Sequence, residues 1–106
     1  MTPTDDPILV RFRSALHRRF DNQVLRAVLF GSRARGDARA DSDYDIAVFF
    51  KDGLNPWAEL PGLADIGIDI LDETGFVVNA IPFASRSLQE PTMLMHEIRK
   101  DGQDIL

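Results

Sequence analysis

Two short hydrophobic runs, separated by a glycine- and aspartate-rich segment, most constrain what this chain can fold into. The first, VLRAVLF at residues 24–30, ends at a glycine, and the second, IAVFF at residues 46–50, follows the polar stretch ADSDYD. A nearly continuous apolar run of this length, bounded by turn residues, is typical of a buried strand. We therefore predict strands over residues 24–30 and 43–50. Between them we expect a glycine–serine turn and a short helix to about residue 38, capped by Ser32.

The two ends of the chain are predicted to be helical. Apolar residues recur at helical spacing over residues 7–20, and Asp6 stands where a capping residue belongs, directly before Pro7. A second helix is expected over about residues 90–100, where Gly102 is placed to end it.

A long middle segment is open to two interpretations. Residues 66–71, IGIDIL, alternate in polarity as in a strand, whereas the wider spacing of apolar residues over 56–74 fits a helix that the following glycine would end. We favour the helix, because it leaves residues 76–83 as a clean following strand. Pro82 lacks a backbone N–H, so this strand is expected at an edge of the sheet or to end there.

Composition narrows the class of protein. A chain of 106 residues without cysteine is expected to form one domain with no disulfide, thiolate zinc site or cysteine nucleophile. The net charge of −5 argues against general nucleic-acid binding, which usually requires a basic face. No stretch approaches the roughly 20 apolar residues of a transmembrane helix, and the start of the chain lacks the pattern of a secretory signal. We expect a soluble cytoplasmic protein with no membrane association.

Asp43 and Asp45 are candidate metal ligands. Residues two apart in a strand point to the same face, so the two carboxylates would project side by side, and Tyr44 would pack on the opposite face. Two such carboxylates repel each other unless a cation neutralises them. With no His or Cys near, oxygen ligands of this kind suit Mg²⁺ or Mn²⁺. An Asp-x-Asp pair alone is also common on solvated strand edges.

The turn before these aspartates offers groups that can bind phosphate. Gly31 allows close approach of the backbone, and Ser32 at a helix start offers a hydroxyl and N–H groups to phosphate oxygens. Arg33 and Arg35 are near enough to add positive charge. Metal ligands, a phosphate-binding turn and cations together indicate a phosphoryl- or nucleotidyl-transfer site. Gly-Ser before a helix is, by itself, a common turn.

Residues 31–45 contain the complete pattern G-S-x-A-R-G-x(5)-S-D-x-D. This segment resembles the nucleotidyltransferase domain of the polymerase beta superfamily, and especially its minimal nucleotidyltransferases. The whole chain, residues 1–106, has the size of that domain alone. The resemblance implies an α+β fold, with a small mixed β-sheet and helices packed on one side.

The same resemblance implies roles for individual residues. Gly31 and Ser32 would bind a nucleoside triphosphate, and Asp43 and Asp45 would hold two divalent ions. Arg35 would either add to the nucleotide site with its neighbour or tie the turn to nearby acids.

The family pattern also includes a third carboxylate on a later strand, which completes the metal site and serves as base for the acceptor. If residues 66–71 form a strand, Asp69 is the candidate. If they form a helix, the following strand carries Asn79 and no acid. Asparagine can bind a metal but cannot act as a base near neutral pH.

The function implied by the resemblance is Mg²⁺-dependent transfer of a nucleoside monophosphate, AMP from ATP, to an acceptor hydroxyl. Minimal nucleotidyltransferases of this kind resemble the antitoxins of toxin–antitoxin pairs, in which the acceptor is a tyrosine of a HEPN-type toxin. The alternative, favoured by the missing third carboxylate, is a binding module that neutralises a partner by contact. Trp57, Met93 and Met95 are predicted to be core or partner-facing residues.

Overall fold

Helices and strands alternate along residues 5–106, the part of the chain that the computed structural model describes. Its helices are α1 (Pro7–Phe20), α2 (Ser32–Arg35), α3 (Leu60–Thr74) and α4 (Met93–Asp101). Its strands are β1 (Val24–Phe30), β2 (Tyr44–Phe50), β3 (Val78–Ala84) and β4 (Gln103–Asp104). The 3-10 turns η1 (Asp21–Gln23), η2 (Pro56–Glu59) and η3 (Ser85–Gln89) complete these elements.

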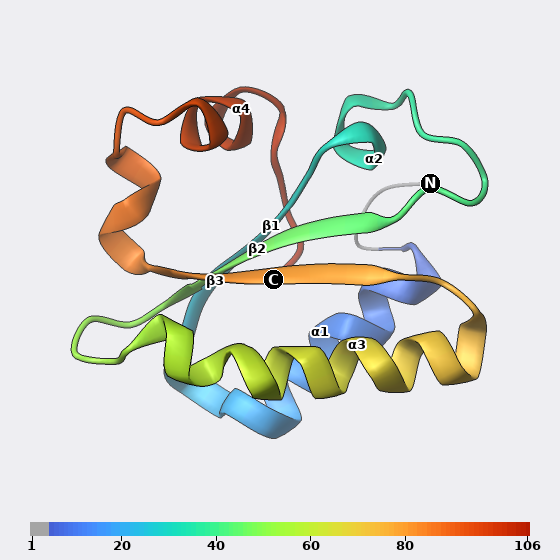
Figure 1. Ribbon diagram of the computed structural model, residues 1–106, viewed down its shortest axis with the longest axis horizontal. Helices are drawn as coiled ribbons and strands as arrows, with labels where there is room; N and C mark the ends of the chain where they lie inside the picture. Colours follow the sequence, from blue (N-terminus) through green and yellow to red (C-terminus); the bar gives the residue numbers. More distant parts are fainter. Residues whose placement is uncertain (1–4) are drawn as a thin grey trace.

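The strands form one mixed sheet in the order β3-β2-β1-β4 (Figure 1). Strand β2 runs antiparallel to β1 and parallel to β3, and the short β4 pairs antiparallel with β1. Asp45 is opposite Phe30 of β1 on one side and Asn79 of β3 on the other. The predicted α+β fold with a mixed sheet is therefore confirmed, and Pro82 lies in an edge strand as expected.

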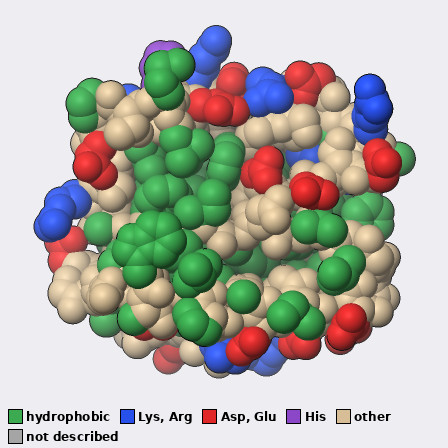
Figure 2. All heavy atoms as spheres, viewed as in Figure 1, with side chains coloured by type: hydrophobic (Ala, Val, Ile, Leu, Met, Phe, Trp, Pro, Cys, Tyr) green, Lys and Arg blue, Asp and Glu red, His purple; other side chains and the backbone are tan. Residues whose placement is uncertain are grey.

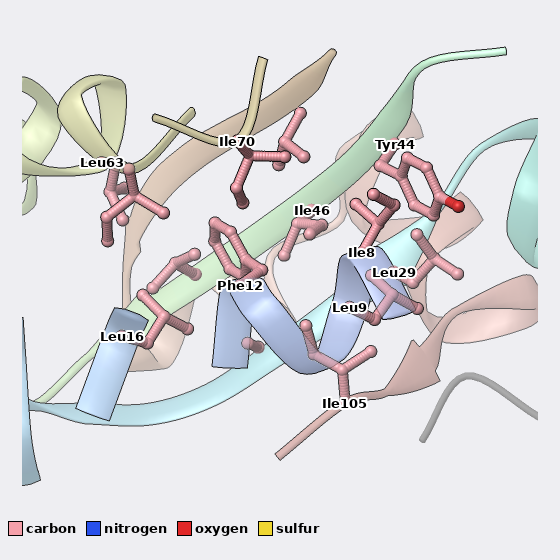
Figure 3. Packing of buried hydrophobic residues seen from close by; sticks show 14 of the residues in the cluster. Ile8, Leu9, Phe12, Leu16, Leu29, Tyr44, Ile46, Leu63, Ile70 and Ile105 are labelled. Carbon is pink, nitrogen blue, oxygen red and sulfur yellow. The ribbon is translucent and has the colours of Figure 1, made fainter. Parts of the chain in front are cut away.

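The two longest helices, α1 and α3, pack on one face of the sheet. The Asp6 side chain caps α1 by accepting a hydrogen bond of 2.8 Å from the N–H of Ile8, and Pro7 occupies the first turn, where no N–H is needed. The apolar side of α1 then meets β1, β2 and α3 around Phe12, which is fully buried (Figure 3). Burial of an aromatic side chain of this kind anchors the helix on the sheet.

The opposite face of the sheet is partly covered by η3 and α4. Met95 and Ile98 of α4 and Leu88 of η3 pack on side chains from β1 and β2. In Figure 2, hydrophobic side chains gather over the middle of this face, and acidic side chains lie beside them toward the α2 end. The predicted arrangement, with helices on one side of the sheet, therefore holds for α1 and α3. Helix α4 adds a partial layer on the other side.

The predicted elements agree with the structure except in details. The segment at residues 56–74 is helical, as η2 followed by α3, and ends at Gly75, whose positive φ of 81° suits a helix end. Ser32 does not cap α2, because Gly31 holds the cap position with no side-chain hydrogen bond and α2 ends before Gly36. Helix α4 starts later than predicted, with Thr92 as its cap. None of the helices within residues 5–106 is long and apolar enough to cross a bilayer.

Candidate metal and nucleotide site

The aspartate pair lies at the start of β2, on the face of the sheet that α4 partly covers. Asp45 alternates with Ala47 and Phe49, which contact the α4 side, whereas Tyr44 belongs to the buried cluster of α1 and α3. Tyr44 is 4% exposed, so its predicted packing on the opposite face is confirmed. Asp43 directly precedes the strand and is exposed, and Asp45 is half-buried. The pair therefore remains accessible from solvent.

Gly31 brings the backbone of the turn against Asp45. It follows Phe30, the β1 residue opposite Asp45, and has a φ of 77° and a ψ of −156° that side chains disfavour. A Cβ atom at this position would lie 2.6 Å from Oδ2 of Asp45. Only glycine therefore allows the turn and this carboxylate to approach so closely, and Ser32 begins α2 directly beside them.

Asn79 connects the two aspartates from the neighbouring strand. Its Nδ2 donates hydrogen bonds of 3.2 Å both to Oδ2 of Asp43 and to Oδ1 of Asp45. The two carboxylate oxygens consequently converge on one hydrogen-bond donor, the amide group of Asn79. The parallel pairing of β2 with β3 places Asn79 there, opposite Asp45.

These side chains fit a divalent metal ion. Carboxylate oxygens are the ligands that Mg²⁺ and Mn²⁺ prefer. Oδ1 of Asp45 and Oδ2 of Asp43 accept from Nδ2 of Asn79, whereas Oδ2 of Asp45 points to the Gly31 turn. Within residues 5–106 no group of three His, Cys, Asp or Glu side chains is arranged to hold a metal. The fit therefore rests on the two aspartates, because Asn79 faces them with a hydrogen-bond donor.

Asp69 does not lie on a strand. It belongs to α3 and lines a hollow between α1 and α3 together with Arg11, Arg18 and Glu73. A strand over residues 66–71, the condition for Asp69 to be the third carboxylate, is not formed. Asn79 of the following strand lies beside the pair, and that strand carries no acid, as the helical interpretation of residues 66–71 implied.

Arg33 braces the loop that carries Asp43. Its Nε donates to the carbonyl of Ser42 at 2.9 Å and its Nη2 to the carbonyl of Ala40 at 3.2 Å. The guanidinium also lies 3.9 Å from the ring centre of Tyr44, a cation–π contact. Because Tyr44 faces away from Asp45, Arg33 lies on the opposite side of β2 from that carboxylate and holds the loop in place. Binding of nucleotide by Arg33 stays a prediction.

Arg35 ties the turn to nearby acids, the second of its two predicted roles. Its Nη1 donates to Oε1 of Glu97 in α4 at 2.9 Å, and its Nε lies 3.4 Å from Oδ2 of Asp37. Gln103 of β4 adds a hydrogen bond of 2.8 Å from its Nε2 to the carbonyl of Ala34 in α2. These contacts fix α2 to the C-terminal segment, and binding of nucleotide by Arg35 stays a prediction.

A hollow of about 330 Å³ lies behind the turn, and it is not the aspartate site. Arg33, Tyr44 and Gln103 line it, whereas neither Asp43 nor Asp45 does. The carboxylate pair lies outside this hollow, with Asp43 exposed and Asp45 half-buried.

Tyr44 and Asp6 form a long-range contact that sequence reasoning missed. The Tyr44 hydroxyl donates a hydrogen bond of 2.8 Å to Oδ2 of Asp6, across 38 positions of sequence. Burial of the ring, and next the Asp6 carboxylate, raise the pKa of Tyr44 to about 12. Asp6 thus caps α1 with one oxygen and holds β2 with the other.

Ionisation of Tyr44 is expected to weaken the fold between pH 10 and pH 12. Since the folded-state pKa of about 12 exceeds the ordinary value of 10.0, this stabilisation is complete below pH 10 and is lost as the pH rises toward 12. The free energy of unfolding should fall by roughly 2 kcal/mol over this interval. Phenolate absorbance reads the group directly, because the chain has a single tyrosine. An ordinary pKa in the folded protein, or no change of that pKa on adding urea, would contradict the contact.

Comparison with known proteins gives a family and a fold. The family model "Polymerase beta, Nucleotidyltransferase" matches residues 15–106, which include the turn, the aspartates and Asn79. Among curated proteins no match was found.

Three solved structures share the fold. A toxin–antitoxin with AMP-PNP is 22% identical over 92% of this chain and 72% of the other, with a TM-score of 0.63. A protein assigned as a minimal nucleotidyltransferase is 26% identical over 89% of this chain and 88% of the other, with a TM-score of 0.56. A complex of a tri-AMPylated HEPN toxin with its MNT antitoxin, from Shewanella oneidensis, is 19% identical over 93% of this chain and 71% of the other, with a TM-score of 0.53.

Proposed function

Because the chain belongs to the polymerase beta nucleotidyltransferase family, we propose that it transfers a nucleoside monophosphate, AMP from ATP, to an acceptor hydroxyl. The observation that carries this proposal is the convergence of Asp43 and Asp45 beside the Gly31 turn. We further propose that the acceptor is a tyrosine of a HEPN-type toxin. The structural likeness to a complex of a tri-AMPylated HEPN toxin with its antitoxin supports this choice.

The proposed reaction is an in-line displacement at phosphorus. The acceptor oxygen forms a bond to the α-phosphorus as the bond from that phosphorus to the α,β-bridging oxygen breaks. Pyrophosphate leaves, and the hydroxyl proton passes to solvent. Bound Mg²⁺ would supply positive charge to the triphosphate and to the leaving pyrophosphate.

The residues of this chain contribute position and charge. Asp43 and Asp45 would hold the metal at the start of β2, and Gly31 and Ser32 would bring backbone N–H groups close to the phosphates. Arg33 holds the following loop through the carbonyl of Ser42, and Arg35 holds the turn through the carboxylate of Glu97. Preorganisation of this kind is how phosphoryl-group chemistry is catalysed without a covalent intermediate.

Exposed hydrophobic side chains support a protein partner. Trp57 is 64% exposed and Met93 is 85% exposed, whereas Met95 is 3% exposed and belongs to the core. Large apolar side chains left in solvent are typical of surfaces that bind another protein when they gather in a patch. Figure 2 shows such a gathering on the face of the sheet beneath α4.

A second function, neutralisation of a partner by contact alone, is favoured by Asn79. This neutral amide lies between the two aspartates where a base for the acceptor would be useful. A module that binds nucleotide and partner without turnover would need no base there.

Transfer can be tested with ATP labelled in either of two positions. The chain, Mg²⁺ and the product of the adjacent gene are incubated with ATP carrying the label on the α-phosphate or on the γ-phosphate. We expect label on the partner from the α-position only, because the γ-phosphate leaves with pyrophosphate. Replacing the modified tyrosine of the partner with phenylalanine should abolish labelling of the partner. A stable complex that never acquires label would instead support contact alone.

A further inference from the structure

The two oxygens of the Asp45 carboxylate face different neighbours. Oδ1 accepts the hydrogen bond from Asn79 of β3, together with Oδ2 of Asp43. Oδ2 of Asp45 points to the turn, where it leaves no room for a Cβ on Gly31. The aspartate pair therefore has two sides, which we call the β3 side, at Asn79, and the turn side, at Gly31.

The β3 side is poorly suited to an ion. The Nδ2 group of Asn79 already donates to both carboxylates there. A cation would have to displace this group and turn the amide oxygen inward, and even then Asn79 would add no negative charge. Two divalent ions carry four positive charges, against two negative charges from Asp43 and Asp45.

The turn side is better suited to an ion, because the substrate supplies ligands there. Mg²⁺ in nucleotide sites is usually held by one or two carboxylates together with phosphate oxygens and water. Gly31 and Ser32 lie next to Oδ2 of Asp45, so a triphosphate at the turn would bring its own negative charge to this side. One ion here needs no third acid from the protein.

We propose that the site holds a single divalent cation, on the turn side with the triphosphate, and that the lack of negative charge at Asn79 leaves the β3 side without a second ion. This inference rests on the proposed function only in using the same triphosphate site. It also gives Asn79 a role, since a neutral residue at this place limits the ion count. The acceptor hydroxyl then meets no ion on the β3 side, and its deprotonation depends on the acceptor's own surroundings.

The test counts bound Mn²⁺ without any transfer. The chain is dialysed to equilibrium against Mn²⁺ and excess α,β-methylene ATP, which cannot be cleaved at the reacting bond. The Mn²⁺ held in excess in the protein compartment is then measured by electron paramagnetic resonance after acid release. We expect one ion per chain for the wild-type protein and two for Asn79→Asp, which adds a carboxylate on the β3 side. Two ions in the wild-type protein, or one in Asn79→Asp, would overturn the proposal.

Two further variants serve as controls. Asn79→Ala should keep one ion, because it removes the amide without adding charge. Val77→Asp changes the net charge as Asn79→Asp does, but its side chain is in a hollow against α3, so it should also keep one ion. A second ion in Val77→Asp would show that charge alone sets the count and would overturn the role of Asn79.

The wild-type count decides the matter even where a variant fails to fold, and it is independent of turnover. Label transfer together with two ions contradicts the inference and leaves the proposed function standing. One bound ion with no transfer to any acceptor supports the inference and contradicts the proposed function.

Discussion

Replacing Asp45 with asparagine is expected to lower nucleotidyl transfer by about 100- to 1,000-fold, the loss typical of removing one preorganised electrostatic group. The carboxylate of Asp45 lies between the two sides of the site, with Oδ2 against the Gly31 turn and Oδ1 hydrogen-bonded to Asn79. Asparagine has the same shape and removes the charge that would hold the cation. The initial rate of label transfer from α-labelled ATP measures the loss, and thermal unfolding checks that the fold remains.

A matched control for this substitution is Asp65→Asn. Asp65 is an exposed aspartate of α3 that pairs with Arg19 at 3.1 Å, and exposed ion pairs contribute little to stability. Its replacement changes the net charge equally and should leave transfer unchanged. Asp69→Asn adds a stricter comparison, because the sequence made Asp69 a candidate. A loss in Asp69→Asn as large as that in Asp45→Asn would show that the site is not where the structure places it.

The strands and helices that form the frame of this site were predictable because their patterns are local. Strand β1 matches the predicted range residue for residue, since its apolar run ends at a glycine with positive φ. Helix α1 likewise matches, because Asp6 and Pro7 mark its start in the sequence itself. Strand β4 was missed because two residues are too few to show any periodicity.

The contacts that complete the site depend on register and could not be read from spacing. Asn79 meets the aspartates because β3 runs parallel to β2 and pairs it with Asp45, a choice that no local pattern fixes. Arg33 contacts the carbonyl groups of the loop and the ring of Tyr44, on the side away from Asp45. This placement depends on the face of the sheet that Tyr44 occupies. The sequence therefore predicts which residue types lie near the turn, while the pairing and register of the strands determine which of them are in contact.

Gly31→Ala is expected to destabilise the fold and to disable the site together. The backbone there has a φ of 77° and a ψ of −156°, and holding a residue with a side chain in that region costs about 1 to 3 kcal/mol. The new Cβ would also lie 2.6 Å from Oδ2 of Asp45, so the carboxylate must move. We expect the free energy of unfolding to fall by about 2 to 4 kcal/mol once this steric conflict is included. Urea unfolding measures that change, and the α-label assay measures transfer, which should fall at least about 100-fold.

Gly53→Ala separates backbone strain from displacement of the carboxylate. Gly53 has a φ of 89°, and a Cβ there would meet nothing within 4 Å, so its replacement adds strain without a steric conflict. This variant should lose roughly 1 kcal/mol of stability and retain transfer, because it lies outside the site. If Gly31→Ala and Gly53→Ala kept transfer equally well, close contact between the turn and Asp45 would not be required for the reaction. A loss confined to Gly31→Ala, beyond what its stability explains, would instead tie the activity to the position of that one carboxylate.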